Sequence, residues 1–411
     1  MNKVKILTFM AMTVMFLTGC EDGTEPDTLG YVVAIGIDAP ENDAEGFDFT
    51  LQFANPSKIS GGSGESGGKG GKDSIENITV TAPGIYSAVN VANHIISKKF
   101  TLSHTKLLVF SEEVSKNGVE MFFETVGRSS DIRPNTYVAV SKCRAKEFLE
   151  SVNPETEVNP VRYYTMIFEN ENSEFIPKNM AQDFYFHFTS DERDSVMPLC
   201  SVSGKENPEN YDGSGYQYQL ENDVAGEIPT KTEETQVMGM AVFKRDKKVA
   251  EMGEIETEIY NMIIGEYENS YVSYYFSKVP GEPITIIQQS GRKPKIRIDT
   301  SSEAPIIWVE LFVEGDFCSS SPRISVEDNI DLFAEEVSKE LKQEVEKFLK
   351  KTADLGTDIA GFGAYAKRNF RTIADFKEYN WRERYKNAKF NVSVKFSVRR
   401  TGLVVRSEKV D

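Results

Sequence analysis

The first third of the chain alternates strand-like and helix-like patterns, and this alternation restricts the fold more than any other feature. Residues 29–38 (LGYVVAIGID) are apolar enough for a buried strand, and residues 47–53 alternate apolar and polar positions as a half-buried strand does. Apolar residues then recur at helical spacing over 84–98, before a strand at 106–110. Parallel strands joined by helices produce this order. We therefore predict an N-terminal α/β domain built on a βαβ-type sheet.

The same pattern continues to about residue 152, with one interruption. We predict a helix over 114–126, a strand over 136–140 and a helix over 145–152. Residues 60–73 (SGGSGESGGKGGKD) form a flexible Gly/Ser loop because glycine and serine leave the backbone unrestrained. This loop lacks a P-loop pattern, since Lys69 precedes Gly70 and Lys72 precedes Asp73. The N-terminal domain is predicted to cover 28–190.

The rest of the chain does not continue this alternation of strands and helices. We therefore predict a mixed α/β and α+β protein of three consecutive domains. A middle domain over 191–283 contains a hairpin (237–243 and 248–252) and a helix over 254–264. A C-terminal α+β domain over 284–411 is predicted to be an antiparallel sheet covered by long amphipathic helices. Its predicted strands are 284–287, 294–298, 306–317 and 389–398. Its main helix carries an apolar stripe of Ile330, Phe333, Val337, Leu341, Val345 and Phe348.

The N-terminus carries a secretion signal that ends at a cysteine. Lys3 and Lys5 precede a short apolar run over 6–17, and Leu17-Thr18-Gly19-Cys20 follows. The run is shorter than the ~20 residues that span a bilayer. We predict a lipoprotein signal peptide over 1–19, lipidation of Cys20, and a polar tether over 20–27. The alternative is an ordinary secretion signal in which the cysteine occurs by chance.

Charge excludes one class of partner. The net charge is −17, which repels anionic polymers and anionic membrane surfaces on average, so we expect no nucleic-acid partner. One stretch departs from this average, from Lys386 to Lys409. Its basic residues are Lys386, Lys389, Lys395, Arg399, Arg400, Arg406 and Lys409, against Glu408 alone. We interpret the stretch first as a strand with a solvated basic face, with a lipid or partner patch as the alternative.

The sequence offers no catalytic constellation, no cofactor motif and no metal motif. The histidines are His94, His104 and His187, and none belongs to an HExxH or His-Cys cluster. Cys143, Cys200 and Cys318 lie far apart, and we expect each to be a small buried residue. The glycine-rich segment 361–364 is interpreted as a turn and helix start. The acidic loops 41–45 and 191–194 lack the ligand order of a calcium loop. We therefore predict a protein that is not an enzyme.

Several segments, in order along the chain, resemble the C subunits of spore germinant receptors, the GerA-type lipoproteins of the Ger(x)C family. The resemblance begins with the cysteine motif at residue 20. The other segments that carry it are Val33-Ala34-Ile35-Gly36-Ile37-Asp38, Ala54-Asn55-Pro56-Ser57-Lys58-Ile59-Ser60, Leu102-Ser103-His104-Thr105-Lys106-Leu107-Leu108-Val109, Asp131-Ile132-Arg133-Pro134, Gly239-Met240-Ala241-Val242-Phe243-Lys244, Asp358-Ile359-Ala360-Gly361-Phe362-Gly363 and Arg399-Arg400-Thr401-Gly402-Leu403.

The resemblance implies three consecutive domains, no enzymatic activity and a position on the outer face of the inner spore membrane. It also implies a complex with two integral membrane subunits, of A and B type, which is required when nutrients trigger germination. It identifies no residue that contacts a germinant. The chain departs from the family where Glu21-Asp22-Gly23-Thr24-Glu25 replaces the usual Cys-Trp-Asp and basic residues, which puts the contacts of the tether in doubt.

Two other functional classes remain as alternatives. A solute-binding lipoprotein of a transport system would have two similar lobes, whereas the first and last thirds of this chain differ in their predicted pattern of strands and helices. A surface-anchored hydrolase would need a convergent cluster of titratable groups. Three histidines and no nucleophile motif make that class a poor fit to this sequence.

Overall fold

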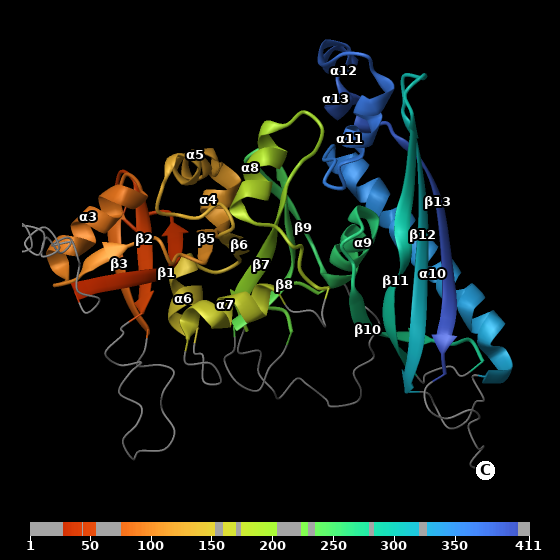
Figure 1. Cartoon of the computed structure of the whole chain (residues 1–411), viewed down its shortest axis with the longest axis horizontal. Helices are drawn as coiled ribbons and strands as arrows, with labels where there is room; N and C mark the ends of the chain where they lie inside the picture. Colours follow the sequence, from red (N-terminus) through yellow and green to blue (C-terminus); the bar gives the residue numbers. More distant parts are fainter. Residues whose placement is uncertain are drawn as a thin grey trace, which may run out of the picture.

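The computed structural model describes residues 28–42, 44–54, 75–152, 159–169, 174–203, 223–228, 235–278, 283–319 and 327–401. These residues form two sheets, a nine-stranded sheet A and a four-stranded sheet B. Figure 1 shows them along the long axis of the molecule, with sheet A in red to green and sheet B in green to blue. The fold therefore combines an α/β part and an α+β part, as predicted.

Sheet A has a parallel centre and antiparallel borders. Its order is β3-β2-β1-β5-β6-β7-β8-β9, with β4 pairing to β1. The pairs β1–β5, β5–β6 and β6–β7 are parallel, whereas β2–β3, β7–β8 and β8–β9 are antiparallel. The strands are β1 (Leu29–Asp38), β2 (Phe47–Ala54), β3 (Ile75–Ala82), β4 (Lys99–Thr101), β5 (Leu107–Ser111), β6 (Tyr137–Ser141), β7 (Val196–Val202), β8 (Thr235–Lys244) and β9 (Lys247–Met252).

Helices cover both faces of sheet A, so its central strands are buried on both sides. One apolar cluster joins the sheet to α3 (Ile85–Ile95), α5 (Glu120–Arg128) and α8 (Ala181–Thr189), which lie above it in Figure 1. A second cluster joins the opposite face to α6 (Ala145–Ser151) and α7 (Pro160–Phe168), which lie below. This three-layer arrangement explains why residues 29–38 are apolar almost throughout.

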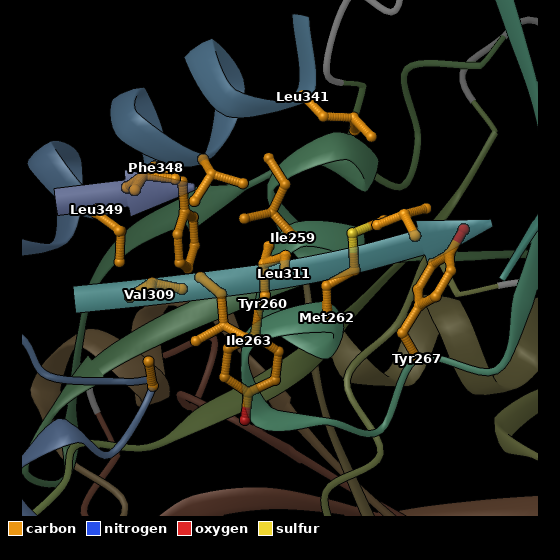
Figure 2. Packing of buried hydrophobic residues seen from close by; sticks show 14 of the residues in the cluster. Ile259, Tyr260, Met262, Ile263, Tyr267, Val309, Leu311, Leu341, Phe348 and Leu349 are labelled. Atoms are coloured by element: carbon orange, nitrogen blue, oxygen red, sulfur yellow. The ribbon is translucent and has the colours of Figure 1, made fainter. Parts of the chain in front are cut away.

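Among the residues that the structure describes, helices cover one face of sheet B. Its order is β10 (Asn269–Tyr275), β11 (Pro283–Asp299), β12 (Ile306–Ser319) and β13 (Lys389–Arg400). Helices α9 (Glu254–Ile264) and α10 (Ile330–Leu355) pack on its inner face, where Figure 2 shows Ile259 and Ile263 beside Val309 and Leu311. The remaining elements are α4 (Glu112–Asn117), α11 (Phe362–Ala366), α12 (Ile373–Tyr379), α13 (Trp381–Tyr385) and the 3₁₀ turns η4 (Glu327–Asn329) and η5 (Lys367–Asn369).

The stripe predicted for the main C-terminal helix is confirmed. Phe333, Val337, Leu341, Val345 and Phe348 of α10 are all buried in the cluster that covers sheet B. An amphipathic helix gains most of its stability from burying such a stripe, because isolated helices are marginal in water. The stripe therefore covers the chain's own sheet.

The predicted boundary near residue 190 falls inside a continuous structure. Strands β7, β8 and β9 extend sheet A, whereas β10 belongs to sheet B, so the segment 191–283 contributes to both sheets. One apolar cluster also joins Val196 and Met240 of sheet A to the core of sheet B. The division into folding units at 28–190, 191–283 and 284–411 stays a prediction.

Three predicted elements differ from the structure. The helix predicted over 114–126 is two helices, because Gly118 (φ 126°) ends α4 before α5 starts. The strands predicted over 284–287 and 294–298 are one strand, β11, whose register shifts absorb the polar interruption. Sheet B is antiparallel except that β13 runs parallel to β12, since α10 carries the chain back along the sheet.

Some predictions concern residues outside the described ranges. These are the signal peptide over 1–19, the tether over 20–27 with Cys20, the glycine-rich loop over 60–73, and the basic residues Arg406 and Lys409. In the ranges that are described, none of the helices combines the length and apolar character that crossing a bilayer requires.

Candidate functional site

The strongest candidate site is a crevice where three parallel strands of sheet A end. In an open α/β sheet, ligands bind outside the carboxyl ends of the strands, because loops and helix starts converge there. Here a cavity of about 350 Å³ lies at the ends of β1, β5 and β6. Its lining consists of Asp38, Ala39, Ser111, Glu112, Glu113, Lys116, Lys142, Cys143 and Arg144. We call it the carboxyl-end crevice.

Two of its polar residues are committed to the ends of helices. Asp38 accepts hydrogen bonds from the backbone N–H groups of Ala145 (2.8 Å) and Lys146 (2.9 Å), at the start of α6. Ser111 caps α4 by accepting from the N–H of Val114. Burial raises the pKa of Asp38, against the two backbone donors that lower it. Both residues therefore shape the crevice by fixing where α4 and α6 begin.

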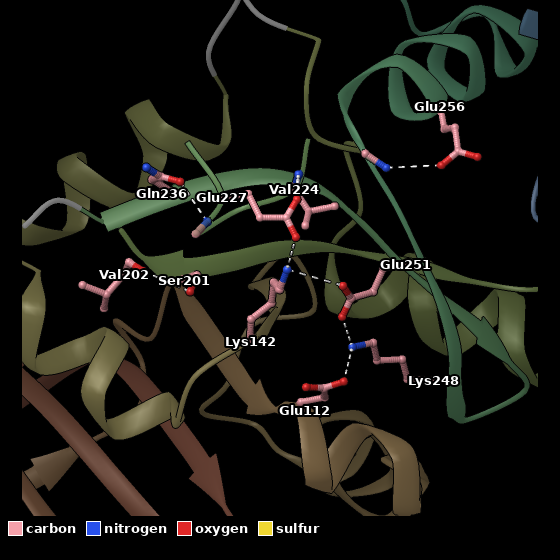
Figure 3. Close-up of polar contacts among 12 residues, drawn as sticks. Glu112, Lys142, Ser201, Val202, Val224, Glu227, Gln236, Lys248, Glu251 and Glu256 are labelled. Atoms are coloured by element: carbon pink, nitrogen blue, oxygen red, sulfur yellow. Dashed lines mark hydrogen bonds and ion pairs between the residues drawn. The ribbon is translucent and has the colours of Figure 1, made fainter. Parts of the chain in front are cut away.

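Lys142 of the crevice belongs to a chain of ion pairs that crosses from β6 to β9. Lys142 Nζ lies 3.0 Å from Glu227 Oε1 and 3.7 Å from Glu251 Oε2. Lys248, whose side chain is 3% exposed, pairs with Glu251 and lies 3.1 Å from Glu112. Figure 3 shows the resulting order Glu227, Lys142, Glu251, Lys248 and Glu112. Positive and negative charges therefore alternate along this wall.

The other cations at the crevice are paired as well. Lys116 lies 2.7 Å from Glu112, and this contact lowers the pKa of Glu112. Arg144 lies 3.2 Å from Asp48. Cys143 Sγ lies 3.3 Å from Ser141 Oγ, a hydroxyl that is no base for the thiol. A charged group of a binding partner could therefore replace one member of an ion pair in the crevice. Among the described residues that line it, Cys143 has a hydroxyl and no base beside it.

A second polar cluster joins the two sheets, and all of its members except the half-buried Arg382 are buried. Asp358 accepts from the N–H groups of Gly361 (2.9 Å), Phe362 (3.0 Å) and Gly363 (2.7 Å) and from the indole of Trp381 (2.8 Å). Asp194, which is 1% exposed, accepts from the N–H of Asp358 and pairs with Arg382. Burial raises the pKa of Asp358 to about 6. We call Asp194, Asp358, Trp381 and Arg382 the junction cluster.

The junction cluster explains the glycine-rich segment noted in the sequence. Asp358 satisfies the free N–H groups at the start of α11, so the interpretation of 361–364 as a turn and helix start is confirmed. Gly361 has a φ of 76°, and a side chain at Gly363 would collide with Trp381. The segment therefore has a structural role in holding the two sheets together.

The histidines lie in three different places. His94 bonds to its own helix, and His104 contacts Ser103 and Tyr31. His187 is largely buried, and burial lowers its pKa to about 3. Among the described residues, no group of three His, Cys, Asp or Glu side chains is arranged to hold a metal ion. The acidic loop at 191–194 instead supplies Asp194 to the junction cluster.

The cysteines differ from one another in exposure. Cys200 is buried, as expected, whereas Cys143 is half-buried and Cys318 is exposed, so the expectation of burial is wrong for Cys318. Sequence reasoning also missed Lys142, Lys248 and Asp358. The spacing of Lys142 after strand β6 was the one available signal, because polar residues just beyond parallel strands meet at one edge.

Two family models match the chain in order. The model described as "Spore germination protein N-terminal domain" matches residues 22–202. The model described as "Spore germination B3/ GerAC like, C-terminal" matches residues 238–402. Both the carboxyl-end crevice and the junction cluster are built from residues within or between these two matched ranges.

Individual relatives extend over most of the chain. The chain is 23% identical over 410 residues to spore germination protein KC of Bacillus subtilis (strain 168), covering 98% of this chain and 97% of the relative. It is 20% identical over 307 residues to spore germination protein GerQC of Bacillus cereus, covering 74% and 76%. The crystal structure of the GerBC protein matches with a TM-score of 0.48 and 13% identity, covering 89% of this chain and 96% of that one.

Proposed function

Because this chain belongs to the GerAC-like family of spore germination proteins, we propose that it is the lipid-anchored C subunit of a nutrient germinant receptor. The observation that carries the proposal is the ordered match of both family domains along nearly the whole chain. In this proposal the protein is exported, cut before Cys20 and held to the outer face of the inner spore membrane by acyl chains on that cysteine. It then assembles with two integral membrane subunits, of A and B type.

The position of the predicted cleavage site supports the anchoring part of the proposal. The N-terminal family model begins at residue 22, directly after Cys20. The first strand that the structure describes, β1, begins at Leu29, nine residues after Cys20 in the sequence. Two acyl chains on one cysteine would give stable membrane attachment, whereas a single chain gives only marginal binding.

The geometry of the carboxyl-end crevice supports an assembly role without bond-making chemistry. Asp38 accepts hydrogen bonds from the start of α6, and the three cations that line the crevice are in ion pairs. Cys143 lies beside a serine hydroxyl. A general base or nucleophile needs a partner that activates it. Paired surface charges can instead exchange partners when another polypeptide binds. We therefore place the protein's role in binding and signal transmission between subunits.

Complementation of a deletion strain tests the proposal. Spores without this chain should fail to germinate on nutrients and should recover with the wild-type copy. A Cys20→Ala copy should yield a protein that carries no acyl chains by mass spectrometry, and it should restore little germination. Normal nutrient germination of the deletion strain, with no related gene to replace it, would contradict the proposal.

Two further measurements separate the proposal from its rivals. Affinity purification from detergent-solubilised spore membranes should recover two multi-pass proteins with the wild-type chain. Calorimetry of the chain with amino acids and sugars should give no stoichiometric heat. Tight one-to-one binding of such a solute, with no membrane subunits recovered, would favour the solute-binding alternative.

A further inference from the structure

The outer face of sheet B presents cations and aromatic rings to solvent. Its inner face is covered by α9 and α10, but its outer side chains are exposed or half-buried. We define the open face by seven residues of β11, β12 and β13: Arg292, Lys295, Arg297, Trp308, Phe312, Lys389 and Lys395.

The strand register places these side chains on one side of the sheet. Residues that pair across neighbouring strands point to the same face. Arg297 pairs with Trp308, and Arg292 pairs with Phe312, which in turn pairs with Lys395. The alternate positions Ile307, Val309, Leu311 and Val313 are buried on the inner face. The open face is therefore a continuous surface formed by alternate residues of β12 and β13 and by residues of β11 on both sides of its register shift between Arg292 and Lys295.

The cations of the open face surround its aromatic rings. The guanidinium of Arg292 lies 5.2 Å from the centroid of Phe312, and the ammonium of Lys295 lies 5.3 Å from the same centroid. Trp308 is 37% exposed, while the other tryptophan, Trp381, is buried in the junction cluster. Cations held over an aromatic ring stay close to the sheet.

The open face has the opposite sign to the rest of the molecule. Arg292, Lys295, Arg297, Lys389 and Lys395 are exposed there, and the carboxylates on the same rows are Asp299 and Glu310. Farther along β12, Glu314 and Asp316 follow, and Asp316 is paired with Arg399. The whole chain carries −17, so a negative surface would repel the molecule on average and attract this face.

We propose that the open face docks on an anionic lipid surface and so gives the protein a second membrane contact, independent of the acyl chains on Cys20. The face is broad and made of extended strands, which suits a plane of headgroups. Lysine and arginine side chains bind anionic headgroups, while tryptophan favours the boundary between headgroups and acyl chains. An acidic protein surface would attract the same cations, and the experiment below distinguishes it from a lipid surface.

Vesicle binding by an unlipidated chain tests this proposal. The full chain with Cys20→Ala should sediment with phosphatidylcholine vesicles that contain about one third phosphatidylglycerol, and not with phosphatidylcholine alone. Added salt should weaken the binding, because screening shortens the reach of surface charge. Fluorescence emission of Trp308 should shift to the blue when the anionic vesicles are added.

Charge reversal on the open face provides the matched comparison. In the Cys20→Ala background, Arg297→Glu with Lys395→Glu should lower binding to the anionic vesicles at least twentyfold, since each cation near such a surface contributes about a factor of five. The control, Lys339→Glu with Lys350→Glu, makes the same charge change on the solvent side of α10 and should bind like the parent. A milder pair, Arg297→Gln with Lys395→Gln, repeats the test if the reversed pair unfolds.

Each remaining outcome contradicts the proposal. Equal binding by the open-face and control variants would show that the face is not the contact. Equal binding to neutral vesicles would remove the role of charge. Binding to soluble polyglutamate without binding to anionic vesicles would identify an acidic polypeptide as the partner. Acylation of Cys20 is measured by mass spectrometry of the mature protein and does not depend on the open face, so the proposed function and this inference fail separately.

Discussion

The junction cluster and the open face of sheet B use the same residue types in opposite ways. In the junction cluster, the buried Asp194 is paired with Arg382, whose side chain is 13% exposed, and the oxygens of Asp358 accept four hydrogen bonds from surrounding N–H groups. On the open face, five exposed lysines and arginines outnumber the two carboxylates on the same rows, Asp299 and Glu310. One tryptophan lies in each region, and only Trp308 reaches solvent.

This difference shows how to separate structural charges from charges available to a partner. A buried charge is tolerated only when it is paired and hydrogen-bonded, so its removal should damage the fold. An exposed charge is already solvated, so its removal should change binding and leave stability almost intact. Variants in the two regions test that distinction through their free energies of unfolding.

Removing Arg382 should cause the greatest loss. Arg382→Ala leaves the carboxylate of Asp194 without its cation and deprives the carbonyl oxygens of Ser190 and Arg193 of a donor. Breaking a buried pair in this way costs about 3–5 kcal/mol. Denaturant unfolding should report this loss. Lys386→Ala, which removes an exposed pair with Glu383, is the control and should cost less than about 1 kcal/mol.

Glu258 is buried like Asp358, but its carboxyl group has fewer hydrogen-bond partners. Its Oε1 has no hydrogen-bond partner in the part of the chain that the structure describes, and burial raises its pKa to about 8. Glu174 and Glu254 raise this pKa further. In the folded state Glu258 therefore keeps its proton at pH values where the unfolded chain has released it.

The sign of the pH effect follows from that proton. Between the ordinary glutamate pKa of 4.5 and about 8, the folded state binds more protons, so stability falls as pH rises. The slope from this one group is at most about 1.4 kcal/mol per pH unit. Glu258→Gln should flatten the stability curve by about 2–3 kcal/mol between pH 6 and pH 8, measured by urea unfolding. Parallel curves for the two proteins would show that Glu258 is not protonated in the fold.

Space around the junction cluster can be tested with one methyl group. A Cβ at Gly363 would lie 2.7 Å from Trp381 Cδ1 and would also collide with the carbonyl oxygen of Glu192. Gly363→Ala should therefore cost about 1–3 kcal/mol, as overpacking usually does. Gly127→Ala is the matched control, since Gly127 lies in α5 and a Cβ there meets nothing within 4 Å. That change should stabilise the protein by up to about 1 kcal/mol.

The smallest effect on stability is expected on the open face. Lys395→Ala removes an exposed cation from β13 and should change the free energy of unfolding by less than about 0.5 kcal/mol. Thermal unfolding of this variant should overlap that of the parent. A loss comparable to that of Arg382→Ala would mean that the open face is part of the fold, and the distinction between the two regions would be lost.

Much of the fold could be predicted because local patterns decide it. The buried strand at 29–38, the helix at 254–264 and the apolar stripe of α10 follow from the period of their apolar residues. The lipoprotein motif at Cys20 is also local, although it lies outside the described residues. The split of the helix predicted over 114–126 depended on the backbone angle at Gly118, which composition alone does not reveal.

The sites were decided by contacts between segments far apart in the chain. Lys142 reaches Glu227 and Glu251, and Asp194 meets Asp358 and Arg382, because strands β6 to β9 bring these segments together. No period or motif encodes such pairings, since sequence patterns report only on residues within a turn or a strand.

The family and the elements with a clear apolar period, such as the strand at 29–38 and the buried stripe of α10, could be predicted from the sequence, because they depend on local periodicity and on motifs read in order. Which charged side chains are buried in ion pairs and which are exposed depends on the tertiary structure. The basic strand at 389–400 illustrates the limit: its alternation predicted a solvated basic face, but the aromatic and basic neighbours on β11 and β12 became visible only when the register of sheet B was known. The physical reason is that charge and burial are properties of neighbours in space.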